Sequence, residues 1–318
     1  MLRDKTGLYL VVLMCLFSLI ILDDLILIYL VLEIQSFTLY ILFNLDKKLL
    51  SIKSTLILFF LNGLFSFFFI MYFIYYNNNL LVYYLNILFV YKMGLFPFFF
   101  WVKDVYKGLT FYNILLLIII PKISYFIVLY KILIFDFTII IILSILFSAI
   151  IGINQTRLKE ILAYSSILNI SIIFFMLTKA NNLFIYYLLL YSYFVIALLL
   201  ILRYNYMLEY SSGFLNVNIF LILLFVITIS GIPPLTGFFL KLTFLYVIFF
   251  NDNLTFFLFV IIGLSISLFI YLRFINYIII YKKLNFLLLN NKIYYNTYVI
   301  TYLSIFFFII TNFFVKII

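Results

Sequence analysis

Long apolar runs, rich in Leu, Ile, Phe and Tyr, follow one another along this sequence, and only short polar segments separate them. Each run holds about twenty residues, which is enough to cross a hydrocarbon core of about 30 Å. The runs lack the alternation of polar and apolar residues that is typical of membrane β-barrel strands. The pattern therefore predicts an all-α polytopic membrane protein.

We expect about eleven transmembrane helices from these runs and from the turn residues and charges between them. The expected helices are 7–22, 25–45, 54–76, 80–101, 109–131, 137–153, 159–178, 181–203, 214–251, 254–281 and 296–317. Between them there is no polar segment long enough to fold by itself. Residues 1–318 are therefore expected to form a single transmembrane domain.

The ninth expected helix, 214–251, is unusually long, at about 55 Å for a rise of about 1.5 Å per residue. Pro233 and Pro234 interrupt it, so it is either one broken span or two short helices. One broken span leaves few cations outside the membrane core on the less basic side, namely Lys131, Lys179 and Lys316. The positive-inside rule thus favours a single broken span, with the N-terminus on the basic side.

A repeat follows from this count of helices. A broken helix is the fourth of the first five helices, in a segment of about 7–131, and again the fourth of the next five, in about 137–283. Because five is odd, the two sets must be inverted relative to each other, as in many secondary transporters. We expect two inverted five-helix repeats followed by a C-terminal helix at about 296–317.

Composition supports a membrane protein and limits its chemistry. Hydrophobic residues make up 69% of the chain and charged residues 9%, with a mean hydropathy of +1.34. The single cysteine, Cys15, and the absence of histidine argue against disulfides, iron–sulfur ligation and the usual zinc or haem sites. We expect this chain to bind no cofactor or metal. The bias toward Phe, Tyr, Ile, Asn and Lys is typical of an AT-rich, organellar genome.

The net charge of +10 is explained by topology. The excess of Lys and Arg lies in the loops on one side of the membrane, as the positive-inside rule requires. No nucleic-acid partner is needed to account for it, and none is expected.

The most informative stretch places Lys92, Gly94 and Pro97 inside an apolar run. A lysine at the centre of a membrane helix costs about 2.5–3.5 kcal/mol and usually marks an ion pathway. Pro97 removes a backbone donor from the carbonyl four residues earlier, that of Met93. The helix is expected to break next to the charge. The other interpretation is a kinked packing helix whose lysine extends to the surface.

Three further ionisable residues are expected at membrane depth: Glu33, Lys122 and Lys241. Lys122 follows Pro121 about halfway along its helix, and Lys241 follows the break at Pro233 and Pro234. Each lysine alone could instead reach a helix end, but the set suggests a path for charge. An ion pair between Glu33 and Lys92 would keep both residues charged, and breaking a buried pair is strongly unfavourable.

At these residues the chain resembles the antiporter-like subunits of respiratory complex I. The segments that carry the resemblance are Leu32–Tyr40, Lys92–Tyr106, Pro121–Lys122, Asn154–Ser166 and Gly231–Lys241. They follow the family's order along nearly the whole chain, and their joint occurrence is more specific than any one of them.

The resemblance implies a proton-translocating membrane-arm subunit of NADH:ubiquinone oxidoreductase. It implies that Glu33 and Lys92 act as the modulating pair, Lys122 as the central relay and Lys241 as the lysine near the exit. NADH, FMN, iron–sulfur clusters and ubiquinone are expected elsewhere in the complex, so this chain holds no redox centre.

The expected partners are the other membrane-arm subunits, including the paralogous antiporter-like ones, and membrane lipids. The expected location is the mitochondrial inner membrane, with several passes, an N-terminus in the matrix and an organellar gene. Two alternatives stay open: a free-standing cation/proton antiporter, which would work without partners, and a structural membrane-arm subunit without pumping, in which loss of a lysine changes assembly alone.

Overall fold

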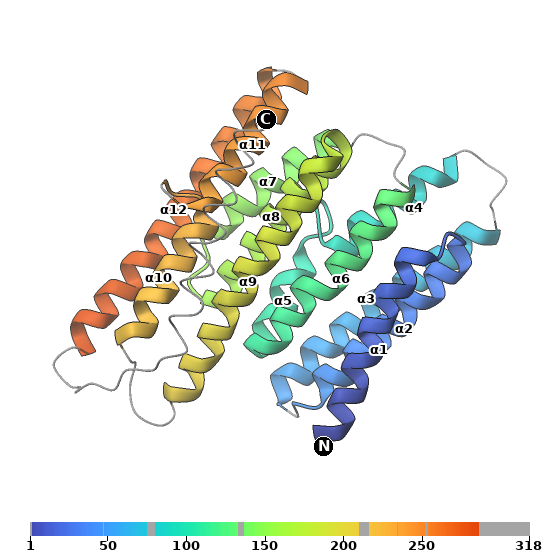
Figure 1. Ribbon diagram of the computed structural model, residues 1–318, viewed down its shortest axis with the longest axis horizontal. Helices are drawn as coiled ribbons and strands as arrows, with labels where there is room; N and C mark the ends of the chain where they lie inside the picture. The colour runs from blue at the N-terminus through green and yellow to red at the C-terminus, as the bar shows by residue number, and fades with distance from the viewer. Residues whose placement is uncertain are drawn as a thin grey trace. The chain divides into compact units, whose positions relative to one another are not determined.

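The computed structural model describes residues 2–46, 48–74, 80–132, 137–209, 216–233, 235–251 and 254–285. Most of these residues lie in helices, and no strand occurs among the described residues (Figure 1). The helices are α1 (Leu2–Ile21), α2 (Leu25–Asn44), α3 (Leu49–Ile74), α4 (Leu80–Met93), α5 (Phe100–Gly108), α6 (Phe111–Ile132), α7 (Thr138–Ile153), α8 (Leu158–Lys179), α9 (Asn181–Glu209), α10 (Asn216–Ser230), α11 (Thr236–Asn251) and α12 (Leu254–Asn285). The expected C-terminal helix at 296–317 lies outside the described residues.

Six helices in the described part of the chain are long and apolar enough to cross a membrane. Their spanning segments are Leu25–Asn44, Leu49–Met71, Phe111–Lys131, Leu158–Lys179, Leu183–Leu202 and Leu254–Asn276. Shorter apolar helices cover Thr6–Ile21, Thr138–Ile153 and Thr236–Phe250. The all-α class predicted from hydropathy is confirmed, while the number of eleven spans and the inverted repeats stay predictions.

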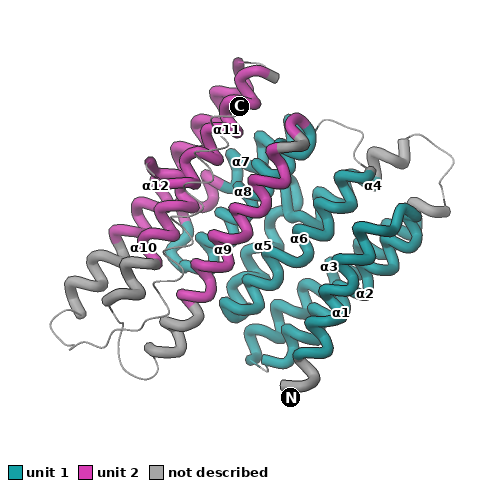
Figure 2. Tube along the Cα trace, in the orientation of Figure 1, with its two compact units in different colours: residues 1–148, 155–178 teal, residues 149–154, 179–318 magenta. Residues whose placement is uncertain are grey.

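The chain divides into two compact units, coloured separately in Figure 2. Unit 1 comprises 1–148 and 155–178, and unit 2 comprises 149–154 and 179–318. In unit 1, α2 packs against α1, α3 and α6, while α3 also packs against α4 and α5. In unit 2, α10 packs against α9, α11 and α12.

Each unit contains a helix interruption where the sequence predicts one. In unit 1, α4 ends at Met93 and α5 begins at Phe100, with Pro97 in the connection. In unit 2, α10 ends at Ser230 and α11 begins at Thr236, with Pro233 in the connection. Pro234 lies outside the described residues.

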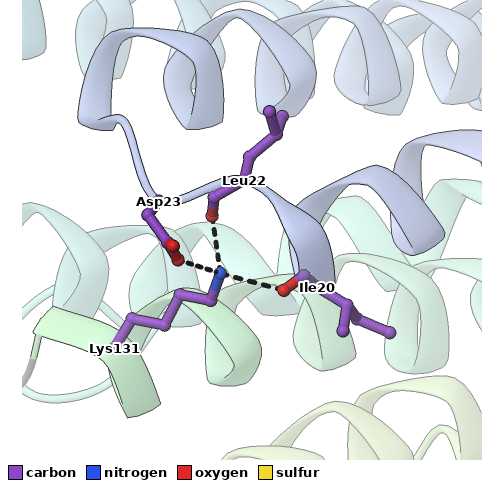
Figure 3. Close-up of polar contacts among 4 residues, drawn as sticks. All are labelled: Ile20, Leu22, Asp23 and Lys131. Atoms are coloured by element: carbon purple, nitrogen blue, oxygen red, sulfur yellow. Dashed lines mark hydrogen bonds and ion pairs between the residues drawn. The ribbon is translucent and has the colours of Figure 1, made fainter.

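Polar contacts fix both ends of α6 within unit 1. At its start, Thr110 Oγ1 and Asn113 Nδ2 donate to Asp46 Oδ2, over 2.9 and 2.8 Å, which ties α6 to the end of α2. At its end, Lys131 Nζ donates to the carbonyl oxygens of Ile20 and Leu22 and to Asp23 Oδ1 (Figure 3).

The cluster around Lys131 closes a helix end. The last carbonyls of a helix have no partner in the helix itself. A lysine is favourable there because its charge opposes the negative end of the helix dipole. Lys131 therefore couples the end of α1 to the end of α6, and Figure 3 shows its ammonium between the three acceptors.

We expect Lys131→Met to lower the thermal stability of the solubilised protein, since each lost hydrogen bond contributes about 1 kcal/mol. Asp23→Asn should change it far less, because the side chain of Asp23 is 92% exposed and exposed ion pairs contribute little. Thermal unfolding of the two variants checks this. Equal losses would mean that the ion pair, and not the capping of α1, holds the two helices together.

Candidate functional site

The break between α4 and α5 begins with a glycine-terminated helix end. Gly94 has a φ of +72°, which glycine adopts without the penalty that a side chain would bring. Leu95 N–H donates to Val90 O and Gly94 N–H to Tyr91 O, the two bonds of a Schellman motif. The motif uses the carbonyls of Val90 and Tyr91 and leaves those of Lys92 and Met93 without helical partners.

Lys122 satisfies these two carbonyls from the neighbouring helix. Its Nζ donates to Met93 O at a distance of 2.5 Å and lies 3.5 Å from Lys92 O. Lys122 is buried, with 6% of its surface exposed. The carbonyl of Met93 is the one that Pro97 was expected to deprive of its donor, and the lysine takes the place of that missing donor.

The second break repeats this arrangement in unit 2. Gly231 has a φ of +77°, and Ile232 N–H donates to Ile227 O while Gly231 N–H reaches Thr228 O. The next carbonyl, that of Ser230, accepts a hydrogen bond of 2.5 Å from the buried Lys241 Nζ. In both units, a lysine ammonium thus binds the carbonyl directly before a left-handed glycine.

A cavity of about 50 Å³ in unit 1 is lined by both Lys92 and Lys122. A single water molecule needs roughly 10–15 Å³ on this measure, so there is room for a few. Gln35 and Trp101 also line the cavity, and the Gln35 amide nitrogen and the Trp101 indole nitrogen are buried without a hydrogen-bond partner in the described structure. Two lysine side chains and two unpaired N–H groups, those of Gln35 and Trp101, therefore face a space large enough for a few water molecules.

The predicted ion pair between Glu33 and Lys92 is not formed as a direct contact. Among the described residues, neither Glu33 Oε1 nor Lys92 Nζ has a hydrogen-bond partner, and no ion pair within 4.0 Å joins them. The two charges still interact electrostatically at longer range. The sequence predicts that both groups lie at membrane depth, but the distance between their charged ends depends on how α2 and α4 pack.

The structure thus brings two of the four predicted site residues, Lys92 and Lys122, to one cavity, with Glu33 within electrostatic range. Lys241 belongs to unit 2, with its own helix break. Sequence reasoning missed Gln35 and Trp101. The proximity of Gln35 to Glu33, and the position of the only tryptophan just after Pro97, were the available signals.

Residues 71–269 match the family model described as "NADH:quinone oxidoreductase/Mrp antiporter, TM", and this is more than half of the 318 residues. The chain belongs to this family. Lys92, Lys122, Lys241 and both helix breaks fall within the matched residues, while Glu33 precedes them.

Relatives in this family are named "NADH-ubiquinone oxidoreductase chain 2". That of Paracentrotus lividus is 34% identical over 200 residues, which is 59% of this chain and 56% of the relative. That of Suncus etruscus is 36% identical over 165 residues, or 48% of this chain and 47% of the relative. The chain thus matches about half the length of these relatives.

Two solved structures share the fold of this family member. The complex titled "Respiratory complex I from Thermus thermophilus with bound Aureothin" contains a chain that matches with a TM-score of 0.73 and 21% identity, covering 83% of this chain and 68% of that chain. The Mrp complex from Dietzia sp. DQ12-45-1b contains one with a TM-score of 0.72 and 16% identity, covering 83% and 58%.

We expect Gly231→Ala to destabilise the second break of this family member. A Cβ at position 231 would lie 2.7 Å from Lys241 Cδ, and the left-handed conformation costs a non-glycine residue about 1–2 kcal/mol. The lysine must then move away from Ser230 O, which lowers thermal stability. Gly63→Ala is the matched control, because a Cβ added there would meet no atom within 4 Å other than the backbone of its own helix. Equal stability of the two variants would contradict the expectation.

Proposed function

We propose that this chain is the antiporter-like subunit of respiratory complex I named chain 2, and that Glu33, Lys92, Lys122 and Lys241 carry protons through it. The observation that supports this most is the pair of buried lysines, Lys122 and Lys241, each bound to the open carbonyl end of a broken helix. Interrupted helices whose ends bind ions are how many transporters build sites at membrane depth. The assignment to complex I comes from the relatives, which are named as chain 2 of NADH-ubiquinone oxidoreductase.

The bond from Lys122 to Met93 O couples the charge of the lysine to the structure. A hydrogen bond from a charged donor is roughly twice as strong as one between neutral groups. An ammonium at position 122 therefore holds the end of α4 firmly, and an amine that has given up its proton holds it weakly. Proton transfer would loosen and tighten the contact between α6 and the first helix break.

The cavity supplies the route between Lys92 and Lys122. Both groups are nitrogen donors when protonated, so a proton passes between them by way of a molecule that can both accept and donate, such as water. The two like charges also repel each other across a small, poorly screened space. A proton that arrives on one lysine therefore favours release from the other.

Glu33 acts on Lys92 through its charge, as the modulating partner, and Lys241 acts in unit 2 as the lysine nearer the exit. The chain works in the mitochondrial inner membrane with the other membrane-arm subunits, including paralogous antiporter-like ones, and with lipids. The distribution of cations supports an N-terminus in the matrix. NADH, FMN, iron–sulfur clusters and ubiquinone act in other subunits, and quinone reduction there drives the transfer.

Lys122→Ala should lower both NADH oxidation and proton pumping by at least about tenfold in an assembled complex, since a positioned proton-transfer group contributes roughly 10²–10⁴-fold. The rate of NADH oxidation and the rate of proton pumping are measured separately in sealed membranes, with assembly checked on a native gel. The exposed Lys107→Ala is the matched control. Normal pumping by an assembled Lys122→Ala complex would support the structural-subunit alternative.

The free-standing antiporter is the second candidate, because the family also includes Mrp antiporters and the Dietzia Mrp complex shares the fold. The purified chain alone, reconstituted in vesicles with a pH gradient, should then exchange Na⁺ or K⁺ for protons. We expect no exchange above that of empty vesicles. Cation-dependent collapse of the gradient that Lys122→Ala abolishes would overturn the assignment to complex I.

A further inference from the structure

Lys92 has an aromatic partner where a carboxylate was expected. Its Nζ lies 3.8 Å from the ring centroid of Phe65 and 5.4 Å from that of Tyr125. Both distances are within the roughly 6 Å at which a cation is attracted to the face of a ring. Lys92 is 5% exposed, and its ammonium has no hydrogen-bond partner among the described residues. The rings are therefore its main contact.

Neighbouring rings hold Phe65 in place. Phe65 is fully buried in α3 and contacts Phe69 of the same helix and Phe89 of α4, with centroids 5.5 and 5.9 Å apart. Tyr125 of α6 contacts Phe89 at 6.3 Å. We call Phe65 and Tyr125 the aromatic seat of Lys92. Its rings come from α3 and α6, so the seat is a feature of how unit 1 packs.

Glu33 is the competing partner for the same ammonium. Its Oε1 is buried without a hydrogen bond, and its charge interacts with that of Lys92 and lies near Tyr125. A buried oxygen of a carboxylate without a hydrogen bond is costly, although Glu33 as a whole is only partly buried. The Lys92 side chain thus has two places to bind: the ring face, where the structure places it, and the carboxylate.

We infer that Phe65 is a positioning residue that holds the Lys92 ammonium apart from Glu33. When Lys92 and Glu33 separate, the ring of Phe65 binds the ammonium, so that this charge is not left without a partner in the membrane. The inference rests on the proposed function, because it assigns a role within the same proton path. The seat offsets part of the cost of opening the pair. Lys92 can then alternate between a carboxylate and a ring.

The first test is the position of Lys92 in the assembled complex that carries Phe65→Leu, determined by cryo-electron microscopy. Leucine keeps the site apolar but removes the ring face, which shifts the balance toward Glu33 by roughly two- to thirty-fold. We expect Lys92 Nζ within hydrogen-bonding distance of Glu33. A Lys92 side chain that stays where it is in the unaltered complex would overturn the inference.

Phe69→Leu is the matched control for packing. Phe69 is on the same helix and is as deeply buried, with 1% exposed, while the ring contacts of Lys92 are with Phe65 and Tyr125. Proton pumping should fall more in Phe65→Leu than in Phe69→Leu, and Phe65→Tyr, which keeps the ring, should retain most of it. Equal losses in Phe65→Leu and Phe69→Leu would mean that Phe65 is only a packing residue.

A double variant tests whether the aromatic seat acts through Glu33 or through another part of the proton path. If Phe65 acts by competing with Glu33, Phe65→Leu should add little to the effect of Glu33→Gln, because the competing charge is gone. Additive losses would overturn the inference while leaving the proton path intact. Failure of the proposed function is detected separately, by normal pumping in Lys122→Ala. If Phe65→Leu does not assemble, Phe65→Met removes the ring with a more adaptable side chain.

Discussion

The contact between a lysine ammonium and the open carbonyl end of a half-helix underlies the rest of this structure. In a membrane, an unpaired carbonyl and an unpaired charge are each costly, and here each satisfies the other. The contact forms twice, from Lys122 to Met93 O and from Lys241 to Ser230 O, each at a distance of 2.5 Å. In unit 1 the lysine comes from a neighbouring helix, and in unit 2 it comes from the second half of the interrupted helix itself.

This contact makes the proposed proton carriers part of the fold. A lysine that caps a helix end stabilises the interruption, so its removal affects structure as well as transfer. Lys92 differs because it binds rings and not a carbonyl. Two lysines on one cavity therefore have different partners: Lys122 is held by fixed dipoles, whereas Lys92 rests on an apolar surface that it can leave at less cost.

The sequence predicted the features that depend on local chemistry. Gly94, Pro97 and Pro233 mark the interruptions because each has a backbone property that other residues lack. Long apolar runs predict that the four charges lie at membrane depth. Partners in space were not predictable: Lys122 binds a carbonyl 29 residues away. Phe65 is one phenylalanine in a chain that is 23% aromatic, and nothing near it in the sequence distinguishes it.

The way α6 is held has a mechanical consequence. Asp46 fixes the start of this helix and Lys131 ties its end to α1. Pro121, in the middle, removes one hydrogen bond from the helix ladder directly before Lys122. A helix that is held at both ends and lacks a hydrogen bond at its centre bends at that point more easily than it moves along its axis. Bending of α6 at Pro121 therefore moves Lys122 sideways, toward or away from the end of α4.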